Sequence, residues 1–191
     1  QFIDYAARMG WRYTLVDARW DAQIGEDGMR ELDEYARGKG VSVLVWYNSA
    51  GDWNEAPQTP RSRLLDHASR VREFDKLKAM GVAGLKVDFF GGDGSSMIAY
   101  YLDLLADSAP YGFQMNFHGS TLPRGWQRTW PHLQTMEAVR GLEFATFEQA
   151  NADRVPVHAA TLPFTRNVFD PMDFTPLAMV KLNDRVQRRT S

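Results

Sequence analysis

The sequence predicts an α/β fold on a parallel sheet, as part of a (β/α)8 TIM barrel, and three observations predict it. Short apolar runs alternate with amphipathic stretches along the chain. Each apolar run ends on a polar or ionisable residue, as strands do at the end of a barrel where the active site gathers. No glycine fingerprint follows the first run, so an open dinucleotide-binding sheet is disfavoured.

The expected strands are short and almost continuously apolar, which is typical of parallel strands covered on both faces. They lie at residues 12–17, 41–48, 83–88, 112–118 and 132–137, with a sixth candidate at 158–164. Helices are expected between them over residues 29–40, 64–81 and 95–110. The first two helices end at glycine, a residue suited to a helix C-terminus.

The repeated strand–helix unit predicts a single domain over residues 1–191, with no linker to a second one. A complete barrel has eight such units in about 250 residues. The chain opens on an apparent helix with no strand before it. We therefore expect an incomplete catalytic barrel that lacks its first strand and its end.

The composition argues against several kinds of partner. The formal net charge is −2 and no block of like charge occurs, so neither a nucleic-acid surface nor insertion into an anionic membrane is expected. No run of about 18 apolar residues offers a membrane span. Cysteine is absent, which excludes disulfides and cysteine-based metal or redox chemistry. Aromatic residues make up 13%, and their faces suit a core as well as sugar rings.

Asp88 is the most informative strand end. It interrupts the apolar run in GVAGLKVDFFGGDG, residues 81–94, where an unpaired buried carboxylate costs several kcal/mol. The other strands end at Asp17, Asn48, His118 and Glu137. Turns alone favour Asp and Asn at such positions, but His and Glu in the same series favour a functional site at one end of the sheet.

Carboxylates on different strands suggest two kinds of chemistry. Asp88 facing Glu137 or Glu143 across a cleft would suit glycoside hydrolysis, in which one group protonates the leaving oxygen and the other attacks or activates water. Glu137 and Glu143 are also hard oxygen ligands, suited to Ca²⁺ more than to a transition metal. Spacing alone leaves both uses open.

Several stretches between residues 2 and 176 resemble the catalytic barrel of glycoside hydrolase family 97, bacterial α-glycosidases. The matching stretches are FIDYAARMGWRYTLVDARW, VLVWYNSAG, GLKVDFFGGD, MNFHG, RTWPHLQTMEAVRGLEF and TLPFTRNVFDPMDFTP, of which the last is the most specific.

The resemblance implies a role for each acid. Asp88 matches the nucleophile of retaining members, Glu143 the general acid, and Glu137 with Glu143 ligands of a calcium ion. Inverting members carry a glutamate after the histidine of MNFHG, and here that position is Gly119. The resemblance therefore favours a retaining α-galactosidase that acts on an oligosaccharide or α-galactoside. An inverting α-glucosidase, or a truncated sugar-binding barrel without activity, are the alternatives.

Sugar contacts are expected from side chains at the same end of the sheet. Lys86 shares the side-chain parity of Asp88, and the other candidates are Asp17, Trp46, Asn48 and His118. Family members also carry a β-sandwich domain before the barrel and a smaller β domain after it, and they are usually exported to the bacterial periplasm. Since part of the calcium shell comes from the first of these domains, we expect this chain's calcium site to be incomplete.

Overall fold

The computed structural model describes residues 1–174 and has a mixed α/β fold. Its sheet has the strand order β1-β2-β3-β4-β5, with bounds Tyr13–Val16, Ser42–Asn48, Gly84–Asp88, Gln114–Phe117 and Leu133–Met136. Every neighbouring pair is parallel. The five expected strands and their parallel arrangement are therefore confirmed.

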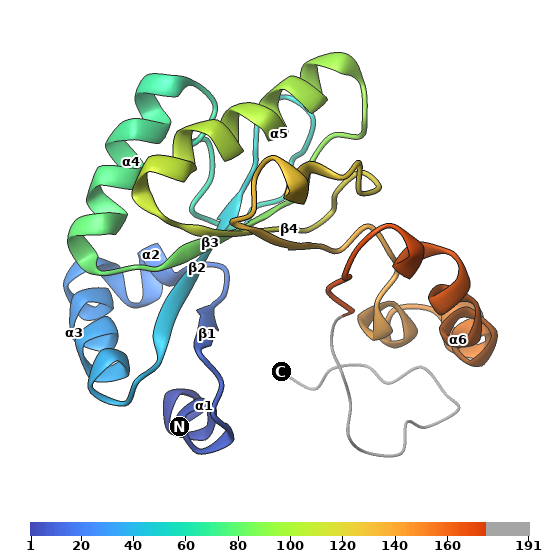
Figure 1. Cartoon of the computed structure of the whole chain (residues 1–191), viewed down its shortest axis with the longest axis horizontal. Helices are drawn as coiled ribbons and strands as arrows, with labels where there is room; N and C mark the ends of the chain where they lie inside the picture. The colour runs from blue at the N-terminus through green and yellow to red at the C-terminus, as the bar shows by residue number, and fades with distance from the viewer. Residues whose placement is uncertain (175–191) are drawn as a thin grey trace.

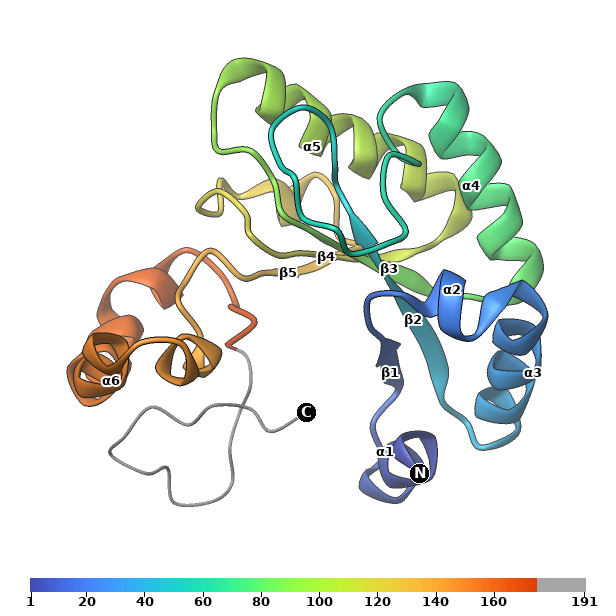
Figure 2. The ribbon, with the colours of Figure 1, turned by 180° about the vertical axis from the view of Figure 1, so that it is seen from behind.

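The helices separate into those that cover the sheet and those beyond its edges. Helices α3, α4 and α5 lie along one face of the sheet (Figure 1). Seen from behind, α1 stands beside the edge strand β1, while α6 lies beyond the opposite edge strand β5 (Figure 2). The helix bounds, with the short helix α2, are Phe2–Met9, Trp20–Gln23, Gly25–Gly38, His67–Met80, Ser95–Ser108 and Gln149–Thr161.

Helix α4 shows how local sequence sets these bounds. The carboxylate of Asp66 accepts a hydrogen bond from the backbone N–H of Ser69 at 2.9 Å and caps the helix, which therefore begins later than residue 64. The helix ends at Met80 and is capped by Gly81, whose φ of 91° is a conformation that glycine adopts without strain.

One apolar layer joins the sheet to helices α3, α4 and α5. Alternate strand residues enter this layer and are fully buried: Val43, Val45, Leu85, Val87, Met115 and Phe117. Facing them from the helices are Met29, Phe74, Leu77, Tyr101, Leu104 and Leu105. Burying each such side chain contributes about 1.5–3 kcal/mol. The intervening strand residues, such as Lys86 and Asp88, are left for the other face of the sheet.

The sixth strand expected at residues 158–164 is wrong. This segment is the end of α6 and a 3₁₀-helix, Leu162–Phe164. Ala159 and Ala160 favour a helix, and so short an apolar run does not distinguish a strand from a helix. The place beside β5 is taken instead by Met172, which forms a parallel bridge with Met136.

The helices of residues 1–174 include none that is both long enough and apolar enough to cross a membrane.

Candidate active site

The carboxyl ends of the strands open onto a cavity of about 670 Å³. Seven of the residues singled out from the sequence for catalysis, metal binding or sugar contact line it together: Asp17, Trp46, Lys86, Asp88, His118, Glu137 and Glu143. The expectation that these strand ends meet is confirmed, while their chemical roles stay predictions.

Asp88 is held at both carboxylate oxygens. Its Oδ1 accepts a hydrogen bond from the backbone N–H of Phe89 at 2.8 Å, and its Oδ2 accepts one from the indole Nε1 of Trp46 at 3.1 Å. Phe89 has a φ of 67°, so the chain turns sharply as β3 ends. The carboxylate is therefore fixed in direction at the strand tip.

Lys86 supplies positive charge between two acids. Its Nζ lies 3.2 Å from Oδ2 of Asp17 and 3.9 Å from Oδ2 of Asp88. Because the lysine side chain is only 13% exposed, this charge is poorly screened by water. It balances part of the negative charge that the cavity gathers.

His118 lies between two further acids. Its Nε2 is 2.7 Å from Oδ2 of Asp173, and its Nδ1 is 3.7 Å from Oε1 of Glu137. The amide Nδ2 of Asn116 donates to the same oxygen of Asp173 at 2.7 Å. Burial raises the pKa of Asp173, but these hydrogen bonds outweigh it and hold the pKa below its ordinary value.

Asp173 was missed as a site residue by the sequence reasoning. Its segment, PMDFTP, was noted only as a family signature. The side chain reaches the cavity through contacts with β4 and His118 that join residues 55 or more positions apart. The PMDFTP motif marks the segment as part of the family signature. Sequence spacing does not reveal that Asp173 contacts Asn116 and His118.

Glu137 is a buried acid near other acids. Its Oε2 accepts a hydrogen bond from the backbone N–H of Gly119 at 2.8 Å. Burial raises the pKa of Glu137, and the nearby carboxylates of Asp88 and Glu143 raise it further, against the opposing effects of Gly119 and His118. A cation at this place would relieve the repulsion among these groups.

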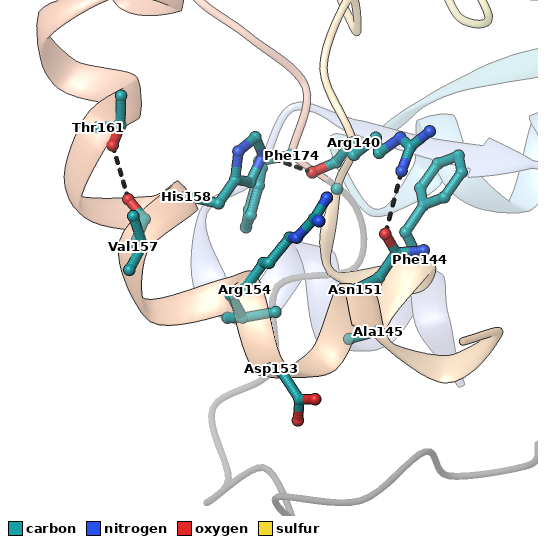
Figure 3. A pocket seen from close by; sticks show the side chains of 12 residues that line it. Arg140, Phe144, Ala145, Asn151, Asp153, Arg154, Val157, His158, Thr161 and Phe174 are labelled. Carbon is teal, nitrogen blue, oxygen red and sulfur yellow. Dashed lines mark hydrogen bonds between the residues drawn. The ribbon is translucent and has the colours of Figure 1, made fainter. Parts of the chain in front are cut away.

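Glu143 stands on a short 3₁₀-helix, Leu142–Thr146, that α6 holds in place. Figure 3 shows Arg140 just before it, with its guanidinium donating to Oδ1 of Asn151 at 3.0 Å and its carbonyl oxygen 2.9 Å from Nε2 of His158. Both partners lie on α6, so this helix anchors the segment that carries the acid. A second cavity of about 510 Å³ lies here and shares Phe144 with the first.

Asn48 does not line the larger cavity, so the sugar contact expected of it has no support. Its side chain is buried, and its Nδ2 donates to the carbonyl oxygens of Ala56 and Gln58 at 3.1 and 3.2 Å. The preference of turns for asparagine explains this strand end. Residues that line the cavity but were not singled out are Leu15, Ala18, Gln58, Phe89, Phe144, Phe147 and Asp173.

The acids fit only part of a calcium shell. Within residues 1–174, no three His, Asp or Glu side chains are grouped so as to hold a metal ion. Calcium takes about six to eight oxygen ligands. Glu137 and Glu143 provide oxygens of the right chemistry. The pKa of Glu137 is raised mainly by burial and further by the carboxylates of Asp88 and Glu143, whose negative charge a cation would offset.

Residues 1–139 match the family model described as Glycoside hydrolase 97. The chain belongs to glycoside hydrolase family 97. A probable retaining α-galactosidase from Streptomyces bingchenggensis is 38% identical over 188 residues, which are 92% of this chain and 26% of that protein. The retaining α-galactosidase of Bacteroides thetaiotaomicron is 31% identical over 186 residues, 93% of this chain and 26% of that protein.

Two solved structures have the same fold as this chain. A crystal structure of a β-arabinopyranosidase is 41% identical, with a TM-score of 0.89 over 98% of this chain and 29% of that one. A family 97 enzyme from Pseudoalteromonas sp. strain K8, in complex with acarbose, is 23% identical with a TM-score of 0.69, covering 92% and 30%. This last likeness shows the fold alone. The family 97 chain described here spans about a quarter of the length of its curated relatives.

Proposed function

We propose that this chain carries the catalytic residues of a retaining α-galactosidase. The observation that carries the proposal is Asp88, oriented at both oxygens and lining the same cavity as Glu143. Two curated relatives named as retaining α-galactosidases align with 92% and 93% of the chain. The whole protein would act on a terminal α-galactoside or an oligosaccharide that ends in one.

The fold proposed for the site is part of a (β/α)8 barrel. The parallel strand order, the helices on one face and the polar strand ends at one cavity support it. Residues 1–191 form an incomplete barrel domain in this proposal, and flanking β domains, with export to the bacterial periplasm, belong to the full-length protein.

The chemistry follows from two carboxyl groups on opposite sides of the sugar. Asp88 attacks the anomeric carbon while Glu143, holding a proton, donates it to the leaving glycosidic oxygen. The bond to the leaving group breaks and a glycosyl ester forms on Asp88. Glu143, now a carboxylate, takes a proton from water as that water attacks the anomeric carbon and releases Asp88. Two inversions give net retention, and the two carboxyl groups are expected about 5–5.5 Å apart.

Calcium is proposed as the metal of this site, held in part by Glu137 and Glu143. When bound, the ion would supply positive charge beside Glu137 and the neighbouring carboxylates of Asp88 and Glu143. The remaining ligands would come from outside the described residues.

A β-arabinopyranosidase is the second candidate. The relative of that name is 41% identical, more than either curated α-galactosidase. L-arabinopyranose has the ring stereochemistry of D-galactopyranose without its hydroxymethyl group, so a β-linked arabinoside matches an α-galactoside at every ring position. The same carboxylates would serve both substrates.

Release of nitrophenol from its α-galactoside, β-arabinopyranoside and α-glucoside tests the proposal, with calcium present. We expect the full-length protein to cleave the first two and to leave the glucoside almost intact. Faster cleavage of the glucoside would overturn the assignment. The same assay on residues 1–191 alone shows whether the isolated barrel domain has any activity or only the fold.

A further inference from the structure

Trp46 lines the cavity but has almost no surface to offer a sugar. It lies on β2, and only 1% of it is exposed. A stacking platform needs an open ring face, so the sugar contact expected from the sequence does not suit this residue. What the side chain presents to the site is its indole N–H, which donates to Oδ2 of Asp88 at 3.1 Å.

The donor is rigid. The ring of Trp46 packs edge-to-face on Phe89, with ring centroids 5.7 Å apart. The carbonyl oxygen of Trp46 accepts a hydrogen bond from Nε1 of Trp20 at 2.9 Å. Strand β2 is itself paired on both sides, with β1 and β3. The indole therefore has little freedom to leave Asp88.

We propose that Trp46 is the positioning residue of the nucleophile, which rests on the proposed function. An indole N–H only donates hydrogen bonds and carries no charge. It can therefore orient the carboxylate of Asp88 while offsetting less of its negative charge than a cationic side chain would. With Oδ1 held by the N–H of Phe89 and Oδ2 by Trp46, rotation of the carboxylate about its own axis is blocked. The attacking lone pair then stays aligned with the anomeric carbon.

Trp46→Phe in the full-length protein removes the N–H and keeps a buried aromatic ring. A hydrogen bond to a charged group contributes about 1.5–3 kcal/mol, so we expect kcat for nitrophenyl α-galactoside to fall by about 10–100-fold with KM little changed. Trp53→Phe is the matched control, because Nε1 of Trp53 donates to Ser49 at 3.2 Å and does not reach Asp88. We expect it to retain wild-type turnover. A raised KM with unchanged kcat in Trp46→Phe would overturn the proposal in favour of a sugar platform.

A double-mutant comparison distinguishes positioning from a general effect on folding. In Asp88→Ala rescued by azide there is no carboxylate to hold, so adding Trp46→Phe should leave the rescued rate unchanged. If the same loss persists there, Trp46 does not act through Asp88. Absence of any glycosidase activity in the wild-type protein would instead count against the proposed function.

The contact itself has a readout that does not depend on activity. Each tryptophan side chain of the full-length protein is expected to give an indole N–H signal in a ¹⁵N spectrum, and the signal that disappears in Trp46→Phe belongs to Trp46. Asp88→Asn should shift that signal more than the signals of Trp20 and Trp53. An unmoved Trp46 signal would contradict the hydrogen bond on which the inference depends.

Discussion

A Cβ atom at Gly119 would lie 3.3 Å from Oδ1 of Asp88 and 3.0 Å from the backbone nitrogen of Phe89. Gly119 also has a φ of 51°, in the left-handed region. The position at which inverting relatives are expected to carry a glutamate is therefore packed against Asp88, the proposed nucleophile. A side chain here would require Asp88 or the backbone of Phe89 to shift by a few tenths of an ångström.

Gly119→Ala should lower both stability and turnover of the full-length protein. The left-handed backbone costs alanine about 1–2 kcal/mol, and the added methyl group presses on the turn that aims Asp88. Gly112→Ala is the matched control, since Gly112 has a φ of 69° but no atom within 4 Å of its added Cβ. Urea unfolding should show a similar loss for both variants, whereas only Gly119→Ala should lose about tenfold or more in kcat. Equal turnover in the two variants would show that the contact with Asp88 is unimportant.

Asp173→Asn should loosen the link between residues 171–174 and β4. One oxygen of Asp173 accepts two hydrogen bonds at 2.7 Å, from Asn116 and His118, and an amide accepts them less strongly. We expect the free energy of unfolding to fall by about 1–3 kcal/mol in urea titration. Asp52→Asn, at an exposed loop position, should change it by less than about 0.5 kcal/mol. If the two variants match, the link through Asp173 does not stabilise the fold.

The sheet was predictable from the sequence because its signal is local. Alternate residues of β2, β3 and β4 are apolar and buried against the helices, as Val43 and Val45 are in β2 and Leu85 and Val87 are in β3. The expectation that the strands are covered on both faces is not met by β1, whose residues are exposed or half-buried. The segment at 158–164 carried a weaker run with two alanines and became helix instead. Periodicity over so few residues does not separate the two structures.

Much of the site was predictable because its residues sit at strand ends, whereas Glu143, which was also predicted, lies on a 3₁₀-helix. Asp88, His118 and Glu137 reach the cavity because parallel strands all end on one side. Asn48 also ends a strand, yet its side chain turns into the loop after β2. Asp173 is brought in by a contact distant in sequence, which no local pattern reports.

Glu73 links stability to pH at a place remote from the cavity. Burial raises its pKa, but hydrogen bonds from Lys76 and Tyr47 outweigh this and hold the pKa below its ordinary value. The carboxylate therefore stabilises the fold above the unfolded-state pKa, and this contribution is lost as pH falls through the lower folded-state pKa. Glu73→Gln should lower the free energy of unfolding at pH 7 by about 1–3 kcal/mol.

The difference between wild type and Glu73→Gln should shrink in urea titrations at progressively lower pH. Glu34→Gln, on the exposed surface of α3, controls for loss of a carboxylate and should follow the wild type. A difference that is constant from pH 7 to pH 3 would mean that the charge of Glu73 is not the source of its effect.

Calcium should stabilise the full-length protein more than residues 1–191 alone. Among the described residues, Glu137 and Glu143 provide only part of the roughly six to eight oxygen ligands that a calcium ion takes. Adding calcium after chelation should raise the melting temperature of the full-length protein, as any ligand of the native state does. Glu137→Gln should reduce that rise. Tight calcium binding by the isolated chain in a titration would contradict the expected incomplete shell.

The stereochemical outcome tests the central claim most directly. Proton NMR of full-length protein acting on nitrophenyl α-galactoside reports the anomeric configuration of the first-formed sugar before it mutarotates. Attack by Asp88, followed by water activated by Glu143, predicts α-galactose first. β-Galactose appearing first would mean a single displacement by water, and Asp88 would then not be the nucleophile.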